Sequence, residues 1–207
     1  MIAPPERLPE RDAAIEAMLP HVPFEGWTIR ALRTGLNVAG LPEDDATLLF
    51  PGGAIDMIAV FCDLADRKME AAAADLTETR PMARVRTIVA LRLRANRPYR
   101  EAIRRALSVL ALPGNASAAA AIAARTVDTI WHAAGDRSAN LSWYTKRAIL
   151  TAVYGAALLF WLRDSSEDDN DTMEFVDRRL RDVRAILKAR GRVESLLSRF
   201  LPAQARP

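Results

Sequence analysis

The residues best suited to chemistry are His132 and Asp136, which lie four positions apart in the segment Trp-His-Ala-Ala-Gly-Asp. An imidazole oriented by a carboxylate is a common general base. The only other histidine is His21, and no motif pairs a serine or cysteine nucleophile with a base. The chain also lacks the Glu-x-x-His repeats that hold two irons in helical bundles. We therefore expect a structural histidine, no metal or other cofactor, and a protein that is not an enzyme.

Composition narrows the class of protein further. Lysine and arginine exceed aspartate and glutamate by 29 to 26, which excludes both a disordered polyanion and a histone-like polycation. Half of the 207 residues are apolar, and the single Cys62 allows no intramolecular disulfide. The N-terminus lacks a secretory apolar region and is too acidic for a mitochondrial presequence. We expect a bacterial cytoplasmic protein with no membrane span, associated peripherally with the inner membrane.

Helical periodicity dominates every long segment, which predicts an all-α fold. Thr28 is a suitable N-cap and Gly40 a suitable helix end. Asp171 and Glu174 have the spacing of a capping box. The expected helices cover residues 9–20, 28–39, 43–49, a stripe from Ile55 to Met69, segments opened by Pro81 and by Pro98, a segment from Asn115 or Ser117 to Gly135, residues 142–163, a segment from Asp171, and a last one after Gly191.

Residues 1–53 resemble the front end of TetR-type transcriptional regulators, with three short helices before a long one. The third helix of such a domain enters the major groove of DNA. Here that helix begins Glu43-Asp44-Asp45, and residues 25–60 contain five acids and two arginines. The acids suit a helix N-terminus, but they would still face the phosphates. We expect a degenerate helix-turn-helix region that binds no nucleic acid.

Residues 80–105 contain nine arginines and one acid, Glu101. Such a run usually forms a solvated helix face, and the alternative is contact with anionic lipid or an acidic partner. The apolar residues that follow can either pack into a filled core, which the pattern favours, or line an apolar cavity. Those expected to contact a lipid in such a cavity are Leu107, Leu110, Ile149, Val153 and Leu158.

Two features near the C-terminus predict surfaces for association. Residues 142–163 are apolar nearly all round and Met173 to Leu187 form a helical seam, which predicts a two-fold homodimer. Residues 191–207 form a basic amphipathic segment that either folds back on the bundle or binds an anionic membrane. Its expected membrane-binding residues are Arg192, Val193, Leu196, Leu197, Arg199, Phe200 and Leu201.

The segment from Thr126 to Val183 strongly resembles the COQ9 family of ubiquinone (coenzyme Q) biosynthesis accessory proteins. Three motifs carry the resemblance: Trp131-His132-x-x-Gly135-Asp136, Trp143-Tyr144-Thr145-Lys146-Arg147-Ala148, and Arg163-Asp164-Ser165-Ser166 with the later Thr172. Outside this segment the resemblance is weaker but collinear.

This resemblance implies a TetR-like fold that has lost DNA binding, dimerises, and holds an isoprenoid quinone or other lipid in the bundle of residues 54–190. It implies that a di-iron demethoxyubiquinone hydroxylase is the partner, at a membrane surface. By motif, the hydroxylase would contact Trp143, Tyr144 and Arg147, with Ile130 as a neighbour. The alternative is a TetR-like transcriptional regulator that binds DNA and a hydrophobic effector.

Overall fold

A computed structural model describes residues 4–136 and 141–183, with side chains from residue 145 onward in the second stretch. Every regular element in these stretches is a helix, which confirms the all-α prediction. The elements are α1 (Pro9–Met18), α2 (Val22–Glu25), α3 (Ile29–Val38), η1 (Glu43–Asp45), α4 (Ala46–Leu49), α5 (Gly53–Ala73), α6 (Pro81–Ala95), η2 (Arg97–Tyr99), α7 (Arg100–Leu110), η3 (Pro113–Asn115), α8 (Ala116–Ala133), α9 (Leu141–Trp161) and η4 (Glu167–Asp169), followed by a helix over residues 170–183.

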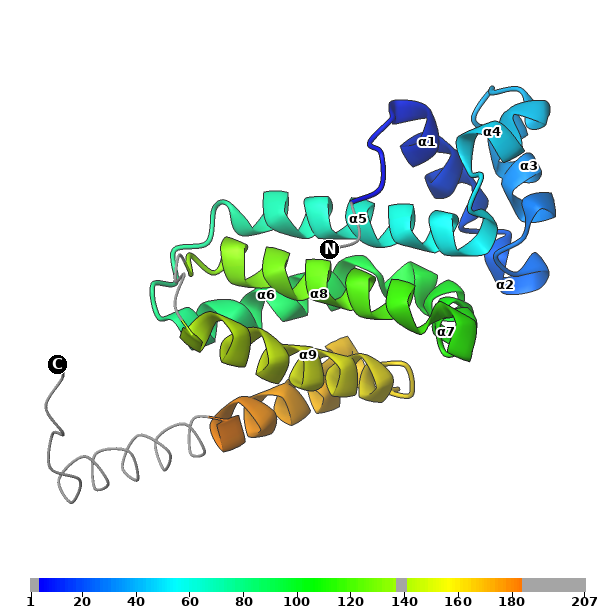
Figure 1. The fold of residues 1–207 in the computed structure, drawn as a ribbon. Coiled ribbons are helices and arrows are strands. Elements are labelled where there is room, and N and C mark those ends of the chain that lie inside the picture. Colours follow the sequence, from blue (N-terminus) through cyan, green and yellow to red (C-terminus); the bar gives the residue numbers. More distant parts are fainter. Residues whose placement is uncertain (1–3, 137–140, 184–207) are drawn as a thin grey trace, which may run out of the picture.

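Helices α1 to α4 form a small cluster at one end of α5 (Figure 1). The predicted cap is confirmed, because the Thr28 hydroxyl accepts a hydrogen bond from the amide of Ala31 at 3.2 Å. Gly40 ends α3 with a φ of +72°, a conformation that glycine adopts without steric cost. The short α2 was not predicted, because Pro20 and Pro23 were interpreted as the end of a helix. Proline is tolerated in the first helical turn, where Pro23 lies.

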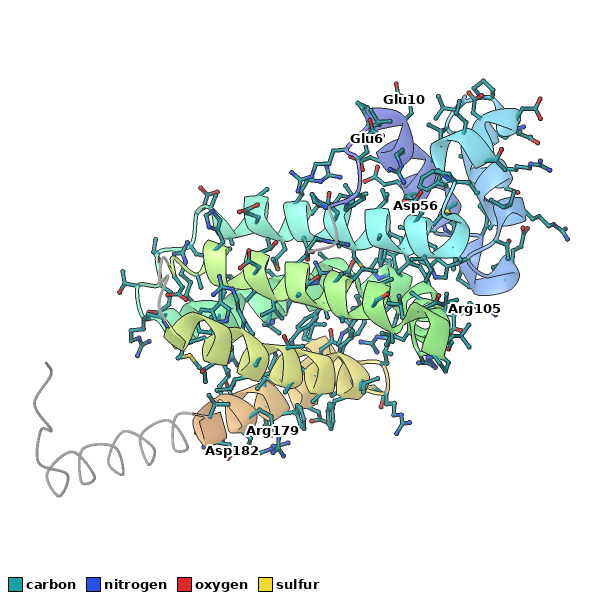
Figure 2. The ribbon with its side chains drawn as sticks, viewed as in Figure 1. Glu6, Glu10, Asp56, Arg105, Arg179 and Asp182 are labelled. Atoms are coloured by element: carbon teal, nitrogen blue, oxygen red, sulfur yellow. The ribbon has the colours of Figure 1, made fainter. Side chains whose placement is uncertain are left out.

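The larger bundle extends from α5 to residue 183. Helix α5 packs against α6 and α8, and α8 packs against α9. Figure 1 shows α9 and the helix over 170–183 on the side of the bundle away from α5. On that last helix the exposed side chains of Arg179 and Asp182 form an ion pair at 3.1 Å (Figure 2). The predicted boundaries at residues 53 and 190 stay predictions.

Local signals at the later helix ends were partly correct. Gly135 ends α8 with a φ of +81°, as predicted, and the amide of Asp136 donates to the Trp131 carbonyl at 3.0 Å. The predicted capping box at Asp171 is wrong. The Thr172 amide donates to the Asp164 carboxylate at 2.8 Å and the Asp171 amide donates to the Ser166 hydroxyl, so the caps come from the preceding turn.

The arginine run is divided between a solvated face and contacts inside the bundle: Arg80, Arg97 and Arg104 keep at least half of their side chains exposed, whereas Arg92 is buried. Arg84 donates to the carbonyls of Ala73, Leu76, Glu78 and Ala133, and thereby joins the ends of α5 and α8. Eight of the nine arginines contact a carboxylate or a carbonyl of the chain. They are Arg80, Arg84, Arg86, Arg92, Arg97, Arg100, Arg104 and Arg105.

Within the described residues, no single helix has both the length and the apolar character required to cross a membrane. Two helix pairs meet those criteria only when taken together, and each pair is bent by more than 80°.

Candidate functional site

The bundle contains an apolar cavity of about 420 Å³ between α5, α6, α7, α8 and α9. A volume of this size is typical of small-molecule sites. The filled core favoured by the sequence pattern is therefore wrong for this part of the bundle. Small residues on three helices leave the space unoccupied, because their side chains fill little volume. They are Ala106, Ala119, Ala123 and Gly155.

Three of the predicted lipid-contact residues line this cavity, namely Leu107, Leu110 and Leu158. The other two do not: Ile149 and Val153 line a separate cavity of about 90 Å³. Positions 149 and 153 on α9 therefore lie on a different side of that helix from the main cavity, which the apolar pattern alone did not resolve.

An open groove of about 990 Å³ lies next to the cavity, between α7, α9 and the start of the last described helix. Leu107, Ala111 and Leu159 belong to the walls of both the groove and the cavity. Two of the residues that line the groove, Phe160 and Phe175, stack with their ring centroids 4.9 Å apart. These shared walls place the groove where a ligand could reach the cavity.

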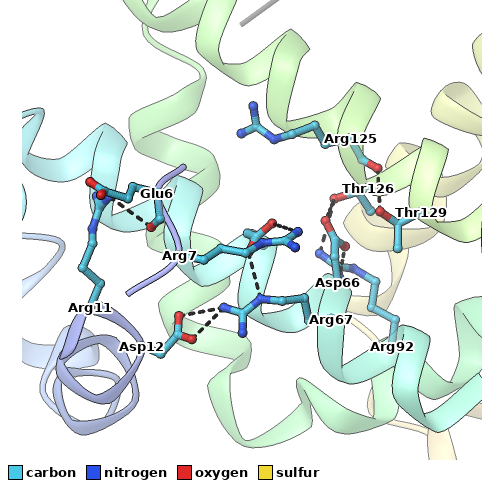
Figure 3. Close-up of polar contacts among 11 residues, drawn as sticks. Glu6, Arg7, Arg11, Asp12, Asp66, Arg67, Arg92, Arg125, Thr126 and Thr129 are labelled. Atoms are coloured by element: carbon cyan, nitrogen blue, oxygen red, sulfur yellow. Dashed lines mark hydrogen bonds and ion pairs between the residues drawn. The ribbon is translucent and has the colours of Figure 1, made fainter. Parts of the chain in front are cut away.

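One side of the cavity is lined by Arg92, Thr126 and Tyr154, which form a buried polar cluster with Asp66. Figure 3 shows Asp66, Arg92 and Thr126. Arg92 forms an ion pair with Asp66, and its Nε donates to the Tyr154 hydroxyl at 2.7 Å. The Thr126 hydroxyl donates to Asp66 Oδ2 at 2.9 Å. Each of these four residues is at most 9% exposed. The cluster therefore joins α5, α6, α8 and α9 beside the apolar space.

Burial determines the protonation of this cluster. It raises the pKa of the Tyr154 hydroxyl and raises that of the neighbouring Cys62 thiol to about 12, so both keep their protons at neutral pH. Burial also raises the pKa of the Asp66 carboxyl, whereas Arg92 and Thr126 favour the carboxylate. The direct ion pair keeps both members charged. The site thus holds compensated charges and no activated nucleophile.

Behind the cluster, further ion pairs connect α5 to the N-terminal helices. Asp63, one turn before Asp66, accepts from Arg7 at 2.9 Å and from Arg67 at 2.9 Å. Arg67 also contacts the Asp12 carboxylate of α1 at 2.7 Å (Figure 3). Because Asp63 accepts from two guanidinium groups, its pKa is lowered despite its burial.

His132 and Asp136 do not form a catalytic pair in the arrangement described. His132 is 76% exposed, which corrects the expected structural histidine, and its Nε2 lies 3.8 Å from Glu70. Asp136 forms ion pairs with Lys146 at 3.1 Å and Arg147 at 4.0 Å. Within residues 4–136 and 145–183, no group of three or more histidine, cysteine or acidic side chains could hold a metal ion.

The structure describes the predicted partner patch only in part. Trp143 and Tyr144 lie in the first turn of α9, and their side chains are outside the described residues. Arg147 is 14% exposed and pairs with Asp128 at 2.6 Å. Ile130 is fully buried in the core, so its predicted place on a contact surface is wrong. The predicted membrane-binding residues 192–201 lie outside the described part of the chain.

Sequence reasoning missed the buried cluster. A usable signal was present, because Asp66 and Arg92 interrupt the apolar stripes of α5 and α6. A charged residue within a buried stripe requires a partner, and the two opposite charges could have been paired. Thr126 and Tyr154 carried no comparable signal in the sequence.

These features define a TetR-like helical bundle with an apolar cavity between its helices. A TetR transcriptional regulator from Nitrosomonas europaea superposes with a TM-score of 0.65, covering 84% of this chain and 97% of that one. The two sequences are 22% identical, so this similarity shows the fold alone.

Residues 116–187 match the COQ9 family. The ubiquinone biosynthesis protein coq9 of Schizosaccharomyces pombe is 31% identical over 86% of this chain and 72% of its own length. The ubiquinone biosynthesis proteins COQ9-A of Xenopus laevis and COQ9 of Homo sapiens are 34% and 33% identical, each over 82% of this chain. This chain belongs to the COQ9 family.

The chain spans just over half the length of the Xenopus laevis and human relatives, 56% of each. Their names support a role in ubiquinone biosynthesis. The same names correct the expected location in a bacterial cytoplasm at the inner membrane, because these relatives are called mitochondrial proteins.

Proposed function

We propose that this protein is a non-enzymatic carrier that binds an isoprenoid quinone or another lipid and presents it to a di-iron demethoxyubiquinone hydroxylase at a membrane surface. The apolar cavity of about 420 Å³, in a chain of the COQ9 family, is the observation that carries the proposal. Each methylene group buried from water contributes about 0.8 kcal/mol, so walls such as Leu107, Leu110 and Leu158 suit a hydrocarbon.

The proposed binding of lipid is tested by filling the cavity with a larger side chain. Gly155 lines the cavity, and a Cβ at this position meets no atom within 4 Å. We expect the purified protein to carry lipid detectable by native mass spectrometry, and Gly155→Leu to lose it while unfolding at the same or a higher urea concentration. Gly114→Leu, also in open space but outside the cavity, is the control. Lipid-free wild-type protein, or equal lipid in both variants, contradicts the proposal.

The hydroxylase contact is proposed at Trp143, Tyr144 and Arg147, in the first two turns of α9. Aromatic residues and arginine are enriched at the energetic centres of interfaces, because they bury large areas with few rotatable bonds. The membrane contact is proposed through residues 192–201, and a second copy of the chain through α9 and the helix over 170–183.

The partner patch is tested with Trp143→Glu. A buried, unpaired charge at an interface centre costs several kcal/mol, so we expect capture of the purified hydroxylase to fall at least about a hundredfold. Leu48→Glu on α4, an exposed position at the other end of the molecule (Figure 1), should leave capture unchanged. If Trp143→Glu folds and still captures the enzyme, the patch is misplaced.

No observation favours the regulator as a second function. Glu43, Asp44 and Asp45 precede the four-residue α4, where a DNA reader needs cations, and the regulator from Nitrosomonas europaea shares the fold alone. We therefore expect the protein to bind no nucleic acid. Anisotropy of a labelled DNA duplex at low salt checks this point.

A further inference from the structure

The apolar cavity contains polar groups that the intramolecular network leaves available. Asn96 follows α6, is 8% exposed, and lines the cavity. Within the described part of the chain, its side-chain amide has no hydrogen-bond partner. The Tyr154 hydroxyl accepts from Arg92, but its own proton has no acceptor among the described residues. Both side chains are more than nine-tenths buried and line the cavity, so their free donors are available to a ligand held there.

The charge of the cavity limits the chemistry of that ligand. Arg92 is compensated by Asp66, with which it forms a buried ion pair. An anionic head group placed here would be desolvated without a net opposing charge, which is costly. A neutral oxygen acceptor, such as a carbonyl, incurs no such cost and can accept from Tyr154 and from the Asn96 amide.

We infer that Asn96 and Tyr154 are specificity residues that hydrogen-bond the neutral, acceptor-bearing polar group of the ligand while it is held inside the cavity. This inference rests on the proposed function and adds a polar preference to it. It predicts discrimination against anionic lipids of equal length.

The test compares three probes with unbranched hydrocarbon tails of ten or eleven carbons. Delipidated full-length protein is loaded with N-phenyl-naphthylamine, a neutral dye that fluoresces in apolar sites, and the dye is displaced with decylubiquinone, decylbenzene or dodecanoate. We expect decylubiquinone to bind at least about tenfold more tightly than dodecanoate. Asn96→Leu and Tyr154→Phe should each weaken the binding of decylubiquinone about five- to tenfold, since each removes one buried hydrogen bond. The affinity for decylbenzene should stay within about twofold of wild type.

Matched controls separate recognition from folding. Thr151→Val alters a polar residue at the same cavity whose hydroxyl already donates to the Arg147 carbonyl at 2.9 Å, so it should not change quinone binding. Asn96→Leu does not touch the Arg92 network, whereas Tyr154→Phe removes an acceptor from it. If dodecanoate binds as tightly as the quinone, or if quinone binding is unchanged in both variants, the inference is overturned and the proposed function is not. Failure of wild-type protein to bind any probe overturns the proposed function as well.

Discussion

At the scale of single residues, Asp164 shows how a family motif serves the fold. Its carboxylate accepts from the amide and hydroxyl of Ser166, at 2.8 and 2.6 Å, and from both the amide and the hydroxyl of Thr172. These donors outweigh the effect of burial and lower the pKa of Asp164 to about 2. Asp164 therefore caps the last described helix and holds the turn that joins it to α9.

Asp164→Asn should destabilise the protein by about 2 to 3 kcal/mol at pH 7, because an amide cannot accept from donors that surround both oxygens. The folded pKa lies below the ordinary value of about 4, so the carboxylate contributes fully above pH 4. That contribution is lost as the pH falls from about 4 to about 2.

Urea unfolding at several pH values measures the difference between wild type and variant. It should be largest at neutral pH and shrink toward pH 2. Asp171→Asn, at the exposed position once expected to cap the helix, should change stability by less than about 0.5 kcal/mol. A difference that grows on acidification would contradict this account of Asp164.

At the scale of elements, the crossing of α1 and α3 depends on Gly35. A Cβ at this position would lie 2.7 Å from Met18 Cβ and 2.9 Å from the Ala14 carbonyl oxygen. Both neighbours belong to α1 and are fully buried, so the two backbones can approach this closely only without a side chain between them. This crossing determines how the N-terminal cluster packs on the end of α5.

Gly35→Ala should cost about 1 to 3 kcal/mol of folding free energy through overpacking, even though alanine favours a helix more than glycine. The comparison is Gly114→Ala, where nothing lies within 4 Å and stability should change by less than about 0.5 kcal/mol. Urea unfolding followed by circular dichroism measures both. A Gly35→Ala protein as stable as wild type would show that the crossing can relax.

At the scale of the whole molecule, the outer face of α9 predicts association. Leu159 is 60% exposed and Phe160 is 37% exposed, next to the stacked Phe175. Large apolar side chains gathered on one helix face of a monomer commonly mark an interface. The proposed two-fold dimer would bury this face against its copy.

Leu159→Glu should therefore convert the dimer into a monomer at micromolar concentration, because the two-fold axis places two unpaired carboxylates in one interface. Light scattering after gel filtration gives the mass. Leu112→Glu, with a similar exposure of 57% but outside α9, should leave the dimer intact. Wild-type protein that is monomeric at these concentrations would contradict the prediction.

Local features of the sequence predicted most of the helices correctly. Helical periodicity, the Thr28 cap and the glycines at 40 and 135 act within a few residues of one another, so they can be interpreted from the chain alone. Predictions failed where the contacts join residues that are farther apart in the sequence. The Asp171 cap was replaced by Asp164. Arg86 pairs with Asp177 on the last described helix, and Arg104 donates to the Leu162 carbonyl just after α9.

By itself, therefore, the sequence determined an all-α chain, its helix order and the motifs of its family. Only the tertiary structure decided that alanines and Gly155 leave a cavity, since an empty volume depends on how five helices pack. It also decided the polar cluster: Asp66 meets Thr126 across 60 positions, and Arg92 meets Tyr154 across 62. Contacts at that separation are set by packing between helices, and local sequence patterns do not predict them.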